Sequence, residues 1–119
     1  MEYISTRGSK VGSFQNVLMK GLAQDGGLFI PNEWPQINTN ELGSDLSYEN
    51  LTAKIIQPFI GSEINEDDLH SIIKSAYKDF SSPDPVTFKK LSRGETVVEL
   101  FNGPTLAFKD FAMQLLIPI

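Results

Sequence analysis

The residue with the clearest potential for covalent chemistry is Lys109, which follows a sharp turn near the end of the sequence. The run Thr96–Phe101 is typical of a β-strand, and Asn102–Pro104 is a turn signal. The proline of this turn disfavours helix before it, and Thr105 is a good N-cap. We therefore expect a helix to begin at Thr105 and Lys109 to lie in its first turn.

A lysine at this place would be poorly solvated. The positive end of a helix dipole disfavours a cation, and Phe101, Phe108 and Phe111 would desolvate the amine. Both effects favour a neutral amine, which is the form that attacks an aldehyde to make a Schiff base. The alternative is an ordinary helix lysine whose amine extends into water. The apolar positions expected to form one buried helix face are Phe108, Phe111, Ala112, Leu115 and Leu116.

Residues 99–110 read Glu-Leu-Phe-Asn-Gly-Pro-Thr-Leu-Ala-Phe-Lys-Asp. This stretch resembles the pyridoxal-phosphate lysine motif of threonine synthases, in which His usually stands where this chain has Asn102. Two further stretches, Tyr3–Gly8 and Asp25–Pro31, are similar to amino-terminal signatures of the same family. The resemblance identifies Lys109 as the cofactor lysine and leaves open what Asn102 does in place of histidine.

Threonine synthases are fold type II pyridoxal-phosphate enzymes. The resemblance therefore implies a carbon–oxygen lyase of threonine biosynthesis that converts O-phospho-L-homoserine and water into L-threonine and phosphate. Lys109 would hold pyridoxal 5'-phosphate covalently and, once released by the substrate, would move protons at the substrate carbons. Asp110 and Gln114 lie four residues apart on one helix face, and we expect them to support the site or to pack, without catalysing.

Much of such a site lies outside this sequence. The phosphate of the cofactor needs a Ser/Gly/Thr-rich loop at a helix N-terminus, and only ten residues follow Lys109. The apolar run Leu115–Ile119 and the greater length of threonine synthases indicate the amino-terminal part of a larger enzyme. The remainder of the catalytic domain would then be the partner of this chain, which alone should be inactive. The role of Arg7 and the oligomeric state stay open.

Two other functions remain possible. A non-catalytic interaction module could keep the amino-terminal fold and pair with another subunit; tight binding to a partner without a cofactor adduct would favour it. A threonine dehydratase-like lyase could use the same lysine, but the stretch Asp25–Pro31 and the Phe-Lys-Asp context weigh against it.

Composition narrows the class of protein. The chain has 119 residues, of which 40% are hydrophobic and 21% charged, and this is ordinary for a small soluble domain. The formal net charge of −5 argues against nucleic-acid binding, since a basic patch is needed to neutralise phosphates. No cysteine is present, which excludes disulfides and thiolate metal sites. Apolar runs are too short for a signal peptide or a membrane span, so a cytoplasmic location is expected.

The patterns predict an α/β chain, with a mixed α+β amino-terminal domain at residues 1–80, a linker at 81–85 and the start of the cofactor-binding domain at 86–119. Helices are expected from Phe14 to near Gly21, over Tyr48–Ile60 and over Glu66–Phe80, with Ser13, Ser47 and Asn65 as N-caps. Strands are expected around Tyr3 and Ile4, and over Leu28–Ile30, where Pro31 should end the strand. Two further strands are expected over Val86–Leu91 and Glu95–Phe101. The β-branched run of residues 96–98 predicts that the last strand is buried. Pro58 should kink or shorten its helix.

Other possible sites are weaker. The stretch Gly8–Ser13 is glycine-rich but lacks the Gly-Lys-Ser/Thr end of a phosphate-binding P-loop, and we favour a plain loop that ends in an N-cap. The acidic residues 66–68 begin a helix, where its dipole favours them, so no metal site is expected. His70 has no partner for a triad or a zinc site and should be a solvated helix residue.

Overall fold

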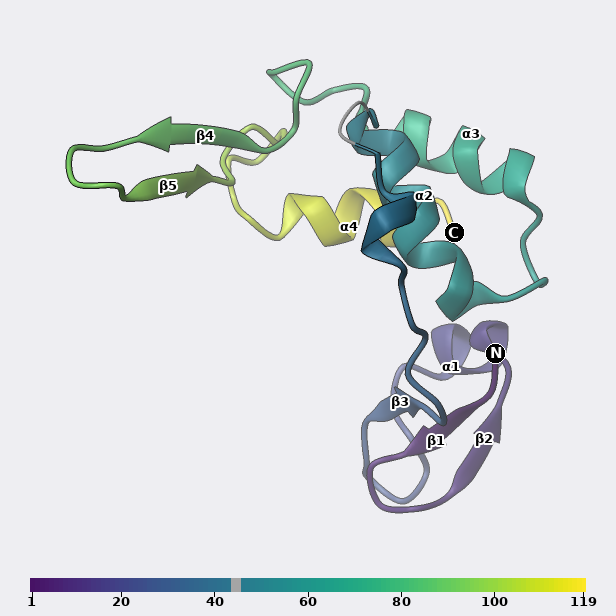
Figure 1. Ribbon diagram of the computed structural model, residues 1–119. Helices are drawn as coiled ribbons and strands as arrows, with labels where there is room; N and C mark the ends of the chain where they lie inside the picture. The colour runs from purple at the N-terminus through teal and green to yellow at the C-terminus, as the bar shows by residue number, and fades with distance from the viewer. Residues whose placement is uncertain (44–45) are drawn as a thin grey trace.

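The computed structural model describes residues 1–43 and 46–119. Its first part is a small sheet with helix α1, its middle part is a helical core, and a β-hairpin projects from that core (Figure 1). The molecule measures 48 × 30 × 29 Å along its principal axes. This mixture of helices and small sheets confirms the predicted α/β class.

The first sheet has the strand order β2–β1–β3, and both pairings are antiparallel. Its strands are β1 (Tyr3–Ser5), β2 (Lys10–Gly12) and β3 (Phe29–Pro31). Strand β2 corrects the expectation of a plain loop at residues 8–13. Strand β3 lies one residue later than the expected strand Leu28–Ile30 and ends with Pro31 itself; β3 is an edge strand, where a proline is tolerated.

Helix α1 (Phe14–Lys20) follows β2 and ends at Gly21, close to the prediction. Ser13 occupies its N-cap position, but the serine side chain makes no capping hydrogen bond. The carboxylate of Glu63 accepts hydrogen bonds from the backbone N–H groups of Phe14 and Gln15, each at 2.9 Å. The start of α1 is therefore capped by a residue that lies about fifty positions further along the chain.

Two longer helices form the centre of the molecule after a short 3-10 turn, η1 (Thr39–Glu41). Helix α2 (Tyr48–Ile60) has the predicted bounds, and α3 (Glu66–Tyr77) begins where predicted but ends before Phe80. The side chains of Ser47 and Asn65 accept hydrogen bonds from backbone N–H groups in the first turns of α2 and α3, respectively, as predicted. Pro58 does not shorten α2, because the helix continues to the fully buried Ile60.

The hydrophobic core lies between α2, α3 and the last helix, α4 (Asp110–Leu116). Ile60, Leu69 and Ile73 are completely buried in it. Helix α4 contributes Leu115 to the same core, and the hydroxyl of Tyr77 donates a hydrogen bond to the backbone oxygen of Phe111 at 3.0 Å. These contacts hold α4 against α3.

Strands β4 (Thr87–Lys90) and β5 (Thr96–Glu99) form an antiparallel hairpin that extends away from the helices (Figure 1). Both Arg93 and Gly94 have positive φ in its turn. Val98 is 51% exposed and Phe88 is 67% exposed, so the expectation of a buried strand is wrong for this chain. The described residues place nothing over the apolar side chains of this hairpin.

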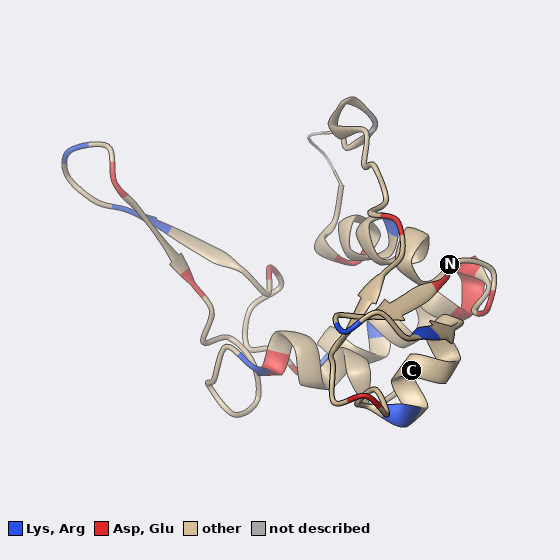
Figure 2. Cartoon of the chain, turned by 90° about the horizontal axis from the view of Figure 1, so that it is seen from below, with Lys and Arg blue, Asp and Glu red and all other residues tan. Residues whose placement is uncertain are grey.

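The division of the chain at residues 81–85 stays a prediction. Helix α4 packs on α3 from beyond that segment, and the segment itself is hydrogen-bonded to Asn102 at both ends. Within the residues that the structure describes, no helix is long and apolar enough to span a membrane. Acidic and basic side chains are dispersed along the chain, without one basic face in the view of Figure 2.

The Glu63 cap gives a testable pH dependence. The hydrogen bond from the backbone N–H of Gln15 is the first of several interactions that lower the pKa of Glu63 below its ordinary value of 4.5. A lowered pKa in the folded state stabilises the protein above pH 4.5, and this contribution is lost as the pH falls through the folded-state pKa. We expect Glu63→Gln to reduce the urea midpoint at pH 7 and to reduce the loss of stability between pH 5 and pH 3. Equal pH dependence of the two proteins would contradict the cap.

Candidate functional site

Residues 102–109, here called the lysine loop, connect β5 to α4. Helix α4 begins at Asp110, so the prediction that it begins at Thr105 is wrong, and Lys109 is the N-cap residue instead of a first-turn residue. The helix begins later because Thr105 bonds to Asp110 and does not cap the residues that follow it. Its backbone N–H and its hydroxyl both donate to the carboxylate of Asp110, at 2.8 and 2.9 Å. Thr105 thus closes the loop onto the start of α4.

The surroundings of Lys109 differ from the expectation. Its side chain is exposed, as are those of Phe101 and Phe108, with exposed fractions of 51% and 66%. Phe111 is half-buried and packs against Phe80 and Tyr48. The described residues therefore do not desolvate the amine of Lys109, but leave it accessible to a reagent or cofactor from solution.

The backbone of the lysine loop is tightly turned around Asp110, whose side chain is only 3% exposed. Gly103 lies so close to this carboxylate that a Cβ added at Gly103 would come within 2.4 Å of the Asp110 side chain. The backbone N–H of Leu106 donates to the oxygen of Gly103 at 3.0 Å, and Leu106 has a φ of 63°. The site therefore requires glycine at position 103.

Asn102 begins the loop and is 7% exposed. Its side-chain amide donates to the backbone oxygen of Pro85 at 3.0 Å and to the hydroxyl of Thr87 at 3.2 Å. Its own backbone oxygen accepts from the N–H of Ser81 at 2.8 Å. Sequence reasoning left the role of this residue open, because its side-chain partners Pro85 and Thr87 lie 17 and 15 positions earlier in the sequence.

The two amino-terminal signature stretches meet around Asp25. The carboxylate of Asp25 accepts hydrogen bonds from the hydroxyls of Ser9 and Ser5 at 2.6 and 2.7 Å, and from the backbone N–H of Gly27 at 2.9 Å. These hydrogen bonds lower the pKa of Asp25 well below its usual range, and the bond from Ser9 has the largest effect. A Cβ on Gly27 would lie 2.0 Å from the Ser5 oxygen. The cluster is a structural junction whose polar groups bond to one another.

Arg7 belongs to the same junction. Its guanidinium donates to the backbone oxygen of Asp25 at 2.8 Å and lies over Gly26, where an added Cβ would be 2.9 Å from Nη1. The guanidinium thus stabilises the turn that precedes β3.

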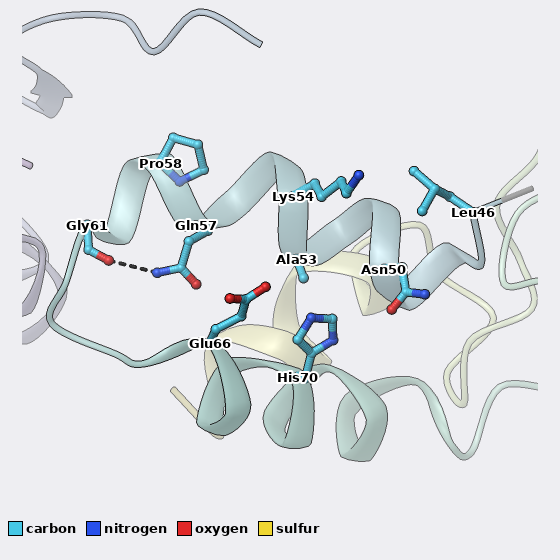
Figure 3. Close-up of a pocket in the computed structure, with 9 residues that line it drawn as sticks. All are labelled: Leu46, Asn50, Ala53, Lys54, Gln57, Pro58, Gly61, Glu66 and His70. Carbon is cyan, nitrogen blue, oxygen red and sulfur yellow. Dashed lines mark hydrogen bonds between the residues drawn. The ribbon is translucent and has the colours of Figure 1, made fainter. Parts of the chain in front are cut away.

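A groove of about 570 Å³ lies between α2 and α3 (Figure 3). Glu66 and His70 point into it from α3, and Gln57 faces them from α2. The amide nitrogen of Gln57 donates to the backbone oxygens of Gly61 and Ile64, which fixes its orientation. No group that could hold a metal ion occurs among the described residues, and none of the lining residues belongs to the lysine loop. The lysine loop is therefore the stronger candidate site.

Known proteins resemble almost the whole chain. The family model "Threonine synthase N terminus" matches residues 2–77. Threonine synthase of Pseudomonas aeruginosa is 42% identical over 98% of this chain and 25% of its own length. The human protein "Threonine synthase-like 2" is 40% identical over 96% of this chain and 24% of its own length.

Solved structures agree with these relatives. The crystal structure of PLP-bound threonine synthase from Brucella melitensis superposes with a TM-score of 0.94 at 41% identity, over 99% of this chain and 26% of that one. Yeast threonine synthase superposes with a TM-score of 0.89 at 38% identity, over 98% of this chain and 25% of that one. This chain thus spans about a quarter of the length of the curated relatives it matches. By sequence and by fold, it belongs to the threonine synthase family and corresponds to the amino-terminal region of that family.

Proposed function

We propose that this chain is the amino-terminal part of a pyridoxal-phosphate-dependent threonine synthase and that Lys109 is its cofactor lysine. The observation that carries the proposal is the lysine loop. Asn102 and Asp110 fix this loop at its two ends, and the amine between them is exposed and free to react. The PLP-bound relative from Brucella melitensis supports the choice of cofactor.

The residues present fit one part of a pyridoxal 5'-phosphate site. An accessible primary amine at the end of a hydrogen-bonded loop can form a covalent bond to the aldehyde carbon of the cofactor. The ten residues after Lys109 form α4 and its end, so this stretch contains no Ser/Gly/Thr-rich loop for the cofactor phosphate. The chain thus supplies the covalent anchor, and the groups that bind the phosphate and the ring would come from the remainder of the catalytic domain.

The proposed reaction converts O-phospho-L-homoserine and water into L-threonine and phosphate, a step of threonine biosynthesis. The cofactor, when bound, withdraws electrons from the carbon next to the substrate amino group. Lys109 would first hold the cofactor and would then accept and donate protons at the substrate carbons beside that amino group. We expect Asp110 to act indirectly, because its carboxylate holds Thr105 and with it the loop from which Lys109 extends.

The synthase reaction is preferred over other lyase reactions because both amino-terminal signatures and the lysine motif are present in order. A threonine synthase and a synthase-like protein match this chain almost equally well, at 42% and 40% identity, so identity alone does not choose between their reactions. A cytoplasmic location and the absence of nucleic-acid partners stay predictions from the sequence.

A chimera tests the lysine. In it, this chain replaces the matching first quarter of Pseudomonas aeruginosa threonine synthase. We expect Lys109→Ala to lower phosphate release from O-phospho-L-homoserine by at least about 100-fold, because general acid–base catalysis alone contributes on the order of 10²–10⁴-fold. Lys109→Arg should be equally inactive, since a guanidinium keeps the charge but not the reactive amine.

The matched controls are Lys89→Ala and Lys90→Ala, which remove exposed lysines from β4 and should keep the activity of the chimera. Borohydride reduction followed by mass spectrometry should find the cofactor on Lys109. An active Lys109→Ala chimera, or a cofactor trapped on Lys89, would refute the assignment.

The 119-residue chain alone should release no phosphate from this substrate. Correct positioning of reactants can contribute about 7–11 kcal/mol to catalysis, and this chain lacks the groups that would position the cofactor. Borohydride trapping with pyridoxal phosphate should label several exposed lysines weakly, among them Lys10, Lys89 and Lys90, with little preference for Lys109. Phosphate release by the purified chain that disappears in Lys109→Ala would show that the site is more complete than proposed.

A further inference from the structure

We propose that Asn102 is a positioning residue that sets where the lysine loop lies relative to the helical core. It does so by closing the segment Ser81–Thr87 into a fixed loop. Asn102 lies at the opposite end of the lysine loop from Lys109, so its effect on catalysis is indirect and rests on the proposed function of that lysine.

The hydrogen bonds of Asn102 join both ends of this segment. At the first end, its backbone oxygen accepts from the N–H of Ser81 at 2.8 Å and from the Ser81 hydroxyl at 3.2 Å. At the other end, its side-chain amide donates to the oxygens of Pro85 and Thr87. The stretch that composition predicts to be an open linker is therefore bonded to a single residue about twenty positions away.

The direction of these bonds is set by the neighbouring groups. The hydroxyl of Thr87 donates to the carboxylate of Glu99 at 2.8 Å, so its oxygen can only accept from Asn102. Thr87 and Glu99 are paired residues at the base of the hairpin. The carbonyl of Pro85 is also only an acceptor. Position 102 therefore needs a side chain that donates hydrogen bonds, and a flipped amide or a carboxylate would face two oxygens.

A histidine at position 102 would meet this requirement only in part. A histidine ring supplies one N–H donor from its neutral form, which can serve one of the two acceptors. Aspartate has nearly the same shape as asparagine but supplies no donor when ionised, and it would add a second charge near Glu99. Leaving a buried donor or acceptor unpaired is destabilising, so these substitutions should weaken the closure of the loop.

The hydrogen bonds of Asn102 connect the core to Lys109 through a short path. Ser81 directly follows Phe80, which is buried in the core, and Asn102 directly precedes Gly103, which packs on Asp110. Asp110 in turn holds Thr105 and is adjacent to Lys109. Each connection in this path is a hydrogen bond, a close contact or a peptide bond.

Distance measurement between two spin labels on the 119-residue chain tests the proposal. The chain has no cysteine, so Lys74→Cys on α3 and Lys109→Cys on the lysine loop give two unique labelling sites, both at exposed positions. We expect a single narrow distance peak by double electron–electron resonance. Asn102→Ala and Asn102→Asp should lose this narrow peak, whereas Asn102→His, which can serve one of the two acceptors, should broaden it only in part.

Asn65→Ala is the matched control, because it removes an asparagine that caps α3 far from the loop in sequence. It should lower the urea midpoint of the chain and leave the narrow peak unchanged. If Asn102→Ala fails to fold, Thr87→Val replaces it, since this change removes one acceptor and preserves side-chain shape; it should broaden the peak.

A narrow peak in Asn102→Asp or Thr87→Val would overturn the proposal, as would equal broadening in Asn65→Ala. The measurement does not depend on cofactor chemistry. Should Lys109 fail to bind the cofactor in the chimera, the distance result would still decide the role of Asn102.

Discussion

The packing of four aromatic rings, those of Tyr48, Tyr77, Phe80 and Phe111, is the interaction on which the position of the candidate site depends. The centroid of the Tyr77 ring lies 5.0 Å from that of Tyr48, and the Phe80 centroid lies 5.2 Å from that of Phe111, with the rings edge to face. The hydroxyl of Tyr77 adds a hydrogen bond to the backbone of α4. Burial is the main cause that raises the pKa of Tyr77 far above its usual range, and the neighbouring Tyr48 adds to it. This hydroxyl therefore remains a donor at every ordinary pH. A helix of seven residues is not stable alone, and this aromatic packing keeps α4 in place.

The sequence was sufficient for elements whose signals are local. Helices α2 and α3 were predicted from their N-caps and their apolar stripes, and Ser47 and Asn65 cap them as expected. The start of α4 was predicted wrongly, because Thr105 has two possible uses: it could cap the residues after it, or bond to Asp110. Sequence rules give the first preference, and the buried carboxylate enforces the second.

The candidate site shows the same limit. The motif predicts Lys109 as the candidate reactive residue, but it does not predict the surroundings of that lysine. Three phenylalanines near a lysine in sequence suggested an apolar pocket, yet only Phe111 turns toward the core, and Phe108 turns outward. The β-branched run of β5 is likewise typical of a buried strand, although this hairpin is exposed here. Both patterns are typical of buried side chains, but the described residues leave these side chains exposed.

The cap that Glu63 places on α1 has a consequence for the order in which the chain folds. Helix α1 has only seven residues, and the side chain of its N-cap residue accepts no hydrogen bond from its N–H groups. Its first N–H groups find their acceptors only when the turn between α2 and α3 is already beside them. Although α1 is synthesised before α2 and α3, it becomes a stable helix only after those two helices have formed. The amino-terminal region is thus synthesised first but completed only after α2 and α3 have formed.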